Sequence, residues 1–234
     1  MSQPNRVALL LSGGPDSASL AQRLIAKGFE VSSLTLANEH HTSNIAEVNC
    51  ARDIAAHLGI LHKVVDLSGL SGLFDTDPNF QLSMGGVSNC LPKQIKVAPG
   101  SVEIMLSAAA SFSIAQGCQQ LYWAVHKGDL DQISADAITE YCTHFSRAIA
   151  IRNQAKFSIE LPFLDMTKAE VLTDGIRNGL SLNKTYSCFS PNLDGSECGS
   201  CYKCKEKARA LQEVDDLMLS GMSLTTRYES NLVR

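Results

Sequence analysis

The turn after the first apolar run of the chain reads Leu11-Ser12-Gly13-Gly14-Pro15-Asp16-Ser17. It lies between a run typical of a buried parallel strand and a segment with apolar side chains at helical spacing. Two glycines allow a tight turn and a close approach to a ligand, and the first N–H groups of a helix attract anions. The lysine of a Walker A loop is missing at the required spacing. The stretch therefore predicts an anion-binding turn, with an ordinary capped turn as the alternative.

Strand and helix signals alternate from this turn onward, which is typical of βαβ units and hence of a parallel sheet covered by helices. Thr167, followed three residues later by Glu170, forms a capping-box pattern that predicts the start of a helix. Residues 68–100 are rich in turn-forming residues and predict a long excursion, which in compact domains is usually functional. The predicted strands are 7–11, 31–36, 61–67, 119–125 and 157–161, and the predicted helices are 16–27, 45–58, 101–116, 134–151, 167–178 and 205–219.

The composition indicates a packed globular chain. It has 234 residues, of which 44% are hydrophobic and 19% are charged, enough apolar material for a sizeable core. The formal net charge of −4 does not favour binding to bulk nucleic acid or to an anionic membrane. The first apolar run is too short for a signal peptide or a membrane span, so we expect a cytoplasmic protein with reduced thiols.

Four of the eight cysteines crowd into a short C-terminal segment: Cys188, Cys198, Cys201 and Cys204. Four thiolates with no open position are typical of structural zinc, which would fold a segment that has little apolar core of its own. An iron–sulfur cluster also takes four thiolates, and Cys201 with Cys204 could instead form a redox pair. The remaining cysteines are interpreted as small hydrophobic residues; they are Cys50, Cys90, Cys118 and Cys142.

The Ser-Gly-Gly-x-Asp-Ser string directly after the first strand resembles the pyrophosphate-binding loop of the PP-loop ATP pyrophosphatase family. Together with the C-terminal Cys-x9-Cys-Gly-x-Cys-x2-Cys, it resembles the 7-cyano-7-deazaguanine synthase branch over residues 6–210. The resemblance implies a Rossmann-like, doubly wound parallel sheet of five strands, with residues 1–180 as the ATP-binding domain and 181–234 as a zinc-binding helical appendage packed on it. Further matching landmarks are Pro162-Phe163-Leu164 before Lys168-Ala169-Glu170, Thr185-Tyr186-Ser187-Cys188, and Glu47 with Ala51 and Arg52.

The resemblance also implies a reaction. The family uses ATP to adenylylate the carboxylate of 7-carboxy-7-deazaguanine, releases pyrophosphate and AMP, and with ammonia makes first an amide and then a nitrile. Residues 11–17 would bind ATP with magnesium, and Asp16 and Lys168 would be catalytic; the alternative for Lys168 is a solvated first-turn lysine. His126 and Asp129, at the end of a predicted strand, would position ATP or magnesium unless they are merely a polar turn. The family further implies a homodimer, with ammonia or another amine from solution or a protein partner.

Three segments depart from the family pattern around its purine pocket, so the acceptor substrate stays open. Residues 97–102 lack an Arg-Asn pair, residues 129–136 lack a Tyr-Pro-Asp-Cys-Arg run, and residues 38–41 replace a Tyr-Gly-Gln-Arg-His stretch. One alternative is a paralogue in a defence or nucleic-acid modification system that acts on a different acceptor, such as a protein amine. Others are a tRNA-thiolating enzyme and a non-catalytic nucleotide-binding subunit. Trp123 is interpreted as a core residue rather than a base-stacking platform.

Overall fold

A computed structural model describes residues 5–37, 42–70, 101–130 and 134–219. The strands are β1 (Arg6–Leu10), β2 (Glu30–Ala37), β3 (Leu61–Asp66), β4 (Gln120–Tyr122) and β5 (Ser158–Glu160). They form one sheet in the order β3-β2-β1-β4-β5, and every neighbouring pair is parallel. The predicted doubly wound α/β fold is therefore confirmed. The strand order reverses between β1 and β4, which is the switch point where open α/β sheets bind ligands.

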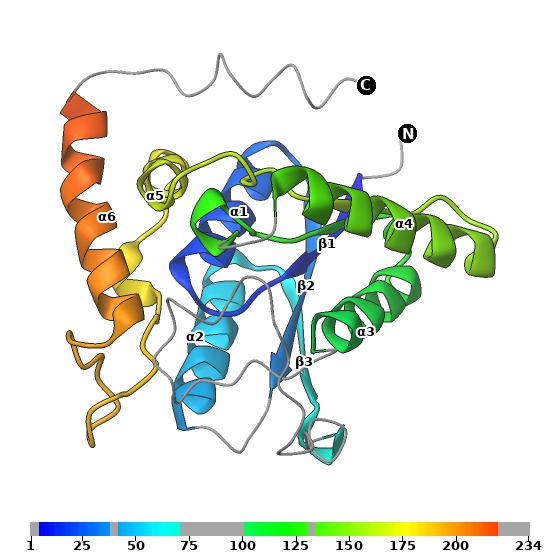
Figure 1. Cartoon of the computed structure of the whole chain (residues 1–234). Coiled ribbons are helices and arrows are strands. Elements are labelled where there is room, and N and C mark those ends of the chain that lie inside the picture. The colour runs from blue at the N-terminus through cyan, green and yellow to red at the C-terminus, as the bar shows by residue number, and fades with distance from the viewer. Residues whose placement is uncertain (1–4, 38–41, 71–100, 131–133, 220–234) are drawn as a thin grey trace, which may run out of the picture.

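Helices cover both faces of the sheet. The α-helices of the described residues are α1 (Pro15–Ala26), α2 (Thr42–Leu58), α3 (Ser101–Ala115), α4 (Ala135–Asn153), α5 (Lys168–Arg177) and α6 (Tyr202–Leu219). Short 3-10 helices lie at residues 68–70, at η2 (Lys127–Asp129) and at η3 (Leu182–Lys184). In Figure 1, α1, α2 and α5 lie on one side of the sheet, α3 and α4 lie on the other, and α6 lies outside α5.

Each face of the sheet has its own apolar core, and β1 contributes to both because its side chains alternate between the two faces. Val7 and Leu9 pack with α1, α2 and α5, while Ala8 and Leu10 pack with α3 and α4. A smaller cluster joins α5 to α6, so the C-terminal helix rests on the α/β domain through α5. That cluster consists of Ala169, Leu172, Ala210 and Val214, with partly buried neighbours.

Several element boundaries differ from the prediction for local reasons. Strand β4 is shorter than the predicted strand 119–125, because its partner β5 has only three residues. The last hydrogen bond between the two runs from the Trp123 N–H to the Glu160 carbonyl at 3.0 Å, and the chain then leaves the sheet. Helix α6 begins at Tyr202 rather than at residue 205, and its first turn includes Cys204. Most of the predicted excursion, residues 71–100, lies outside the described residues, as does Cys90.

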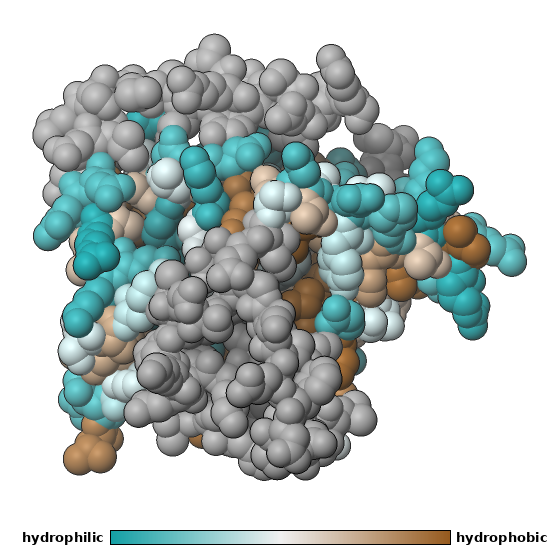
Figure 2. Space-filling model, viewed as in Figure 1, coloured by the Kyte–Doolittle hydropathy of each residue, from teal (hydrophilic) through white to brown (hydrophobic). Residues whose placement is uncertain are grey.

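Polar side chains cover much of the described surface on the face shown in Figure 2. Figure 2 shows hydrophilic side chains over much of the outer faces of α4 and α6. Within the described ranges, no helix combines the length and the apolar composition that crossing a bilayer requires.

Helices α1 and α5 approach each other closely at one glycine. A Cβ added at Gly175 would overlap the side chain of Ser19, whose hydroxyl donates to the Pro15 carbonyl at 2.8 Å. Because Ser19 is held by this bond and is fully buried, it has little room to move. The close approach therefore fixes how the last turn of α5 lies against the first half of α1.

We expect Gly175→Ala to lower the free energy of unfolding by about 1–3 kcal/mol, because overpacking outweighs the better helix propensity of alanine. Urea denaturation measures the effect. Gly69→Ala serves as the control, since a Cβ there meets no atom of the described residues within 4 Å. Equal stability of Gly175→Ala and the wild-type protein would contradict the packing described here.

Candidate functional site

The predicted anion-binding turn follows β1 and packs against the backbone of α2. Gly13 has a φ of +86°, and a Cβ there would overlap the carbonyl oxygen of Glu47, so only glycine fits. The Ser12 N–H donates to the Ser17 hydroxyl at 3.1 Å, and the two hydroxyl oxygens lie 3.0 Å apart. These contacts hold the turn in shape at the N-terminus of α1, where backbone N–H groups attract an anion.

Helices α1 and α5 point their N-termini at the same place and bring Asp16 and Lys168 together. The Lys168 ammonium group contacts the Asp16 carboxylate, and its side chain is 9% exposed rather than solvated. The predicted capping box sets the start of α5: the Glu170 N–H donates to the Thr167 hydroxyl at 3.3 Å, and the Thr167 N–H donates to the Glu170 carboxylate at 2.8 Å. The cap therefore determines where Lys168 leaves the helix.

His126 is fully buried, and its ring is held in one tautomer. The Gly128 N–H donates to His126 Nδ1 at 2.9 Å, so the ring proton of a neutral His126 lies on Nε2. That nitrogen is 3.5 Å from Asp129 Oδ2 and 3.8 Å from Asp16 Oδ1. His126 is thus presented to the turn as a hydrogen-bond donor rather than as a base.

Two buried polar atoms at this point lack a hydrogen-bond partner within the described residues: Asp16 Oδ1 and His126 Nε2. Leaving a buried polar atom unpaired costs about 1–3 kcal/mol, so such atoms call for an explanation. Both atoms lie beside the anion-binding turn and the buried ammonium group of Lys168. The arrangement fits a phosphate group or a phosphate-bound cation as the missing partner.

A cavity of about 200 Å³ extends from the turn across the carboxyl ends of the strands. Its lining includes Ser12, Asp16 and Ser17 of the turn. Most of the other lining residues are apolar and include Met105 and Trp123, which suit a flat ring better than a charged group. Trp123 also packs against the core under α3 and α4. It is therefore a core residue, as predicted, and lines the cavity as well.

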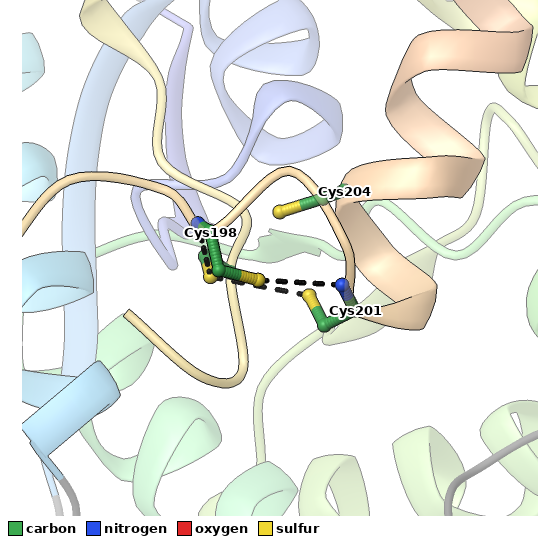
Figure 3. Close-up of side chains that lie close together, drawn as sticks. Cys198, Cys201 and Cys204 are labelled. Atoms are coloured by element: carbon green, nitrogen blue, oxygen red, sulfur yellow. Dashed lines mark hydrogen bonds between the residues drawn. The ribbon is translucent and has the colours of Figure 1, made fainter. Parts of the chain in front are cut away.

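The four clustered cysteines lie together where the chain enters α6. Their sulfur atoms all lie within 4.8 Å of one another, and Figure 3 shows Cys198, Cys201 and Cys204 turned toward a common space beside the first turn of α6. A tetrahedral zinc ion with Zn–S bonds of about 2.3 Å holds its sulfur atoms about 3.8 Å apart, and the Cys201 and Cys188 sulfur atoms already lie 3.9 Å apart. The four predicted ligands therefore form a cluster that is able to bind a metal ion.

Hydrogen bonds to sulfur favour the thiolate form at the exposed side of the cluster. The Ser200 hydroxyl, its backbone N–H and the Cys201 N–H all donate to Cys198 Sγ, and they lower the pKa of Cys198 to about 6. Burial instead raises the pKa of Cys204. A bound cation would offset that cost, since a metal ion stabilises every thiolate around it.

The cysteine cluster is tied directly to the anion-binding turn. The Tyr186 N–H, two residues before Cys188, donates to the Gly13 carbonyl at 3.0 Å. Behind the cluster, Lys207 bridges the Glu197 carboxylate at 3.1 Å and the Thr185 carbonyl at 3.4 Å. The two sites therefore share a backbone contact rather than standing apart.

The structure adds residues that the sequence patterns did not single out. Thr35, at the end of β2, donates its hydroxyl to the Leu11 carbonyl and lines the cavity. Lys203 lies 3.2 Å from Glu206 and 4.0 Å from Asp129. Burial alone would lower the pKa of Lys203, but the carboxylates of Glu206, Asp129 and Asp16 raise it. The position of Thr35 at a strand end was a usable signal, whereas nothing local marked Lys203.

We expect Thr167→Ala to lower the free energy of unfolding by about 0.5–2 kcal/mol, because the first turn of α5 loses its cap. Thermal or urea denaturation measures the change. Thr143→Ala is the control: its hydroxyl bonds the Thr139 carbonyl inside α4 and caps nothing. A Thr167→Ala variant no less stable than Thr143→Ala would show that the cap does not set the start of α5.

Comparison with known proteins gives consistent matches. The family model described as "Queuosine biosynthesis protein QueC" matches residues 6–215. The 7-cyano-7-deazaguanine synthase of Cupriavidus pinatubonensis is 31% identical over 96% of this chain and 98% of its own length. That of Methanoregula boonei is 32% identical over 89% and 94%. Among solved structures, the NMN synthetase of Francisella tularensis shares the fold, with a TM-score of 0.51 at 16% identity, covering 96% of this chain and 81% of that one.

Proposed function

The chain belongs to the QueC family of queuosine biosynthesis proteins, and we propose that it is an ATP-dependent carbon–nitrogen ligase. Its substrate would be 7-carboxy-7-deazaguanine or a related small acid, and its co-substrate ammonia or another amine. The proposal rests on two atoms that have no hydrogen-bond partner within the described residues, Asp16 Oδ1 and His126 Nε2. Both are buried beside the anion-binding turn. A reaction that binds and cleaves a magnesium-bound triphosphate would supply both missing partners, because a phosphate oxygen can accept from His126 Nε2–H and the cation can bind Asp16 Oδ1.

The substrate carboxylate is a poor electrophile, so it must be activated before ammonia can react with it. An oxygen of the substrate carboxylate attacks the α-phosphorus of ATP, the bond to the bridging oxygen breaks, and pyrophosphate leaves. Ammonia then attacks the acyl-adenylate, loses a proton and expels AMP, which gives the amide. In a second round the amide oxygen is adenylylated in the same way, and loss of AMP and of both protons of the amide nitrogen gives the nitrile, as the names of the curated relatives suggest.

The polar and charged residues of the site would each have a separate role in binding the phosphates. The turn at residues 12–17 would hold the departing pyrophosphate through backbone N–H groups and two hydroxyls. Lys168 would neutralise the charge that develops on it, and Asp16 would keep that ammonium group in place. His126 would donate Nε2–H to a phosphate oxygen, because its other nitrogen already accepts from Gly128.

Magnesium, when bound, would neutralise phosphate charge and help to orient the triphosphate. The donor set suits it, because Asp16 and Asp129 offer carboxylate oxygens, the ligands that magnesium prefers. The apolar lining of the cavity, which includes Met105 and Trp123, would contact the adenine ring or the substrate ring. We also propose the cytoplasm as the location, since the four clustered thiols must stay reduced.

We expect the purified protein to form AMP and pyrophosphate when given ATP, magnesium and 7-carboxy-7-deazaguanine. Lys168→Gln should lower the rate by about 10²–10³, the range seen when one donor to a developing charge is removed. Lys156→Gln, which changes an exposed lysine, should leave the rate unchanged. Absence of both products, in protein shown to bind ATP, would rule out this acid. Products formed only with an added protein or amine would favour the paralogue with a different acceptor.

For the cysteine cluster we propose a structural zinc ion, because four thiolates leave no open position for catalysis. We expect elemental analysis to find one zinc per chain, and Cys188→Ser to abolish it and to lower the melting temperature. Cys50→Ser is the matched control, because its thiol lies outside the cluster and bonds the Lys184 carbonyl at 2.8 Å. A brown protein that contains iron instead of zinc would contradict the assignment.

A further inference from the structure

Lys203 occupies an unusual place, because it lies between two cysteines of the cluster and faces the nucleotide site. It is in the first turn of α6, flanked by Cys201 and Cys204. Its ammonium nitrogen lies 3.2 Å from Glu206 Oε2 on the same helix and 4.0 Å from Asp129 Oδ1. The side chain is only 24% exposed, so this ammonium group is partly withdrawn from water.

Asp129 connects Lys203 to the buried histidine. Its oxygens divide between two partners: Oδ1 faces Lys203, while Oδ2 accepts the His126 backbone N–H at 3.1 Å and lies 3.5 Å from His126 Nε2. The Asp129 side chain is 35% exposed, so little packing holds it. A cation on the Oδ1 side therefore keeps the carboxylate turned toward the histidine.

Helix α6 also reaches the backbone that sets the ring of His126. A Cβ added at Gly128 would lie 3.8 Å from the Glu206 carboxylate and 2.8 Å from the His126 ring. The Gly128 N–H is the donor that fixes the tautomer of His126. Glu206 and Lys203 therefore both border the short turn η2, on which the orientation of His126 depends.

We propose that Lys203 is a positioning residue of the nucleotide site, which acts on His126 through Asp129 and thereby links the cysteine cluster to the reaction. Cys201 and Cys204 fix the first turn of α6, that turn presents Lys203 to Asp129, and Asp129 holds His126 against the anion-binding turn. The proposal rests on the ligase function for its kinetic test, whereas its effect on the histidine ring does not depend on which acid is the substrate.

The kinetic test compares Lys203→Met with Lys205→Met, which removes an exposed lysine two residues away. Lys203→Met should lower kcat for pyrophosphate formation by about 10–100-fold, because a small misplacement of a positioned group costs about that much. The KM for ATP should change by less than about threefold, since the turn and Lys168 are intact. Lys203→Arg should recover most of the rate, and Lys205→Met should match the wild-type protein.

A double-mutant cycle tests whether Lys203 acts through Asp129. Asp129→Asn removes the charge that Lys203 holds, so adding Lys203→Met to it should lower kcat no further. If the double variant instead loses kcat by the product of the two single losses, the proposal is overturned, because Lys203 would then act independently of Asp129. Loss of metal from Lys203→Met, measured by elemental analysis, would also overturn it, since the residue would then act on the cluster itself.

A spectroscopic test needs no substrate. Long-range proton–nitrogen NMR spectra distinguish the two neutral tautomers of a histidine ring, and comparison with His126→Gln assigns the signals of His126 among the six histidines. The wild-type protein should show His126 with the proton on Nε2, and Lys203→Met should shift these signals toward an average of the two forms. Unchanged His126 signals in Lys203→Met would overturn the proposal. If no acid supports turnover, the ligase proposal fails, and this spectrum still decides the role of Lys203.

Discussion

The candidate site is built around two buried atoms that have no hydrogen-bond partner in the described residues, Asp16 Oδ1 and His126 Nε2. They lie 3.8 Å apart and come from α1 and from the segment after β4. A folded chain that leaves such atoms unpaired gives up stability that packing must supply elsewhere. The fold places a cation, Lys168, and the N-terminus of α1 at the same point. The local structure is therefore arranged to receive negative charge from outside the chain.

The sheet topology brings these groups together from distant parts of the sequence. Because all strands are parallel, their carboxyl ends meet at one edge, and the reversal of order between β1 and β4 opens a space there. Asp16 follows β1, His126 follows β4, and Lys168 follows β5. Helix α5 has two roles: its first residue faces the site, while Ala169 and Leu172 bind α6. The C-terminal segment is thus held against the site by α5 and by the contact between Tyr186 and Gly13.

Local patterns allowed the prediction of the features whose causes are local. The anion-binding turn, the Thr167 cap and the four-cysteine cluster each depend on residues close together in sequence. The alternation of strands and helices correctly indicated a parallel sheet covered by helices, and the family resemblance added its five doubly wound strands. The short length of β4 was not predictable from its own apolar run, because it depends on the three residues of β5. The tautomer of His126 is fixed by Gly128, two residues away, through a turn geometry that no sequence pattern marked, whereas the burial of Lys168 depends on a partner far along the chain, Asp16. Lys203 escaped notice for the same reason, since its partner Asp129 lies in a different segment.

We propose that the unpaired atoms await magnesium-bound ATP during activation of a carboxylate: His126 Nε2–H would donate to a phosphate oxygen, and Asp16 Oδ1 would bind the cation. Isotope exchange between labelled pyrophosphate and ATP, measured without ammonia, tests it most directly. Reversible formation of an acyl-adenylate predicts that label enters ATP when 7-carboxy-7-deazaguanine or a related acid is present and that the exchange stops when the acid is omitted. A protein that binds ATP and magnesium but shows no exchange with any such acid would contradict the account.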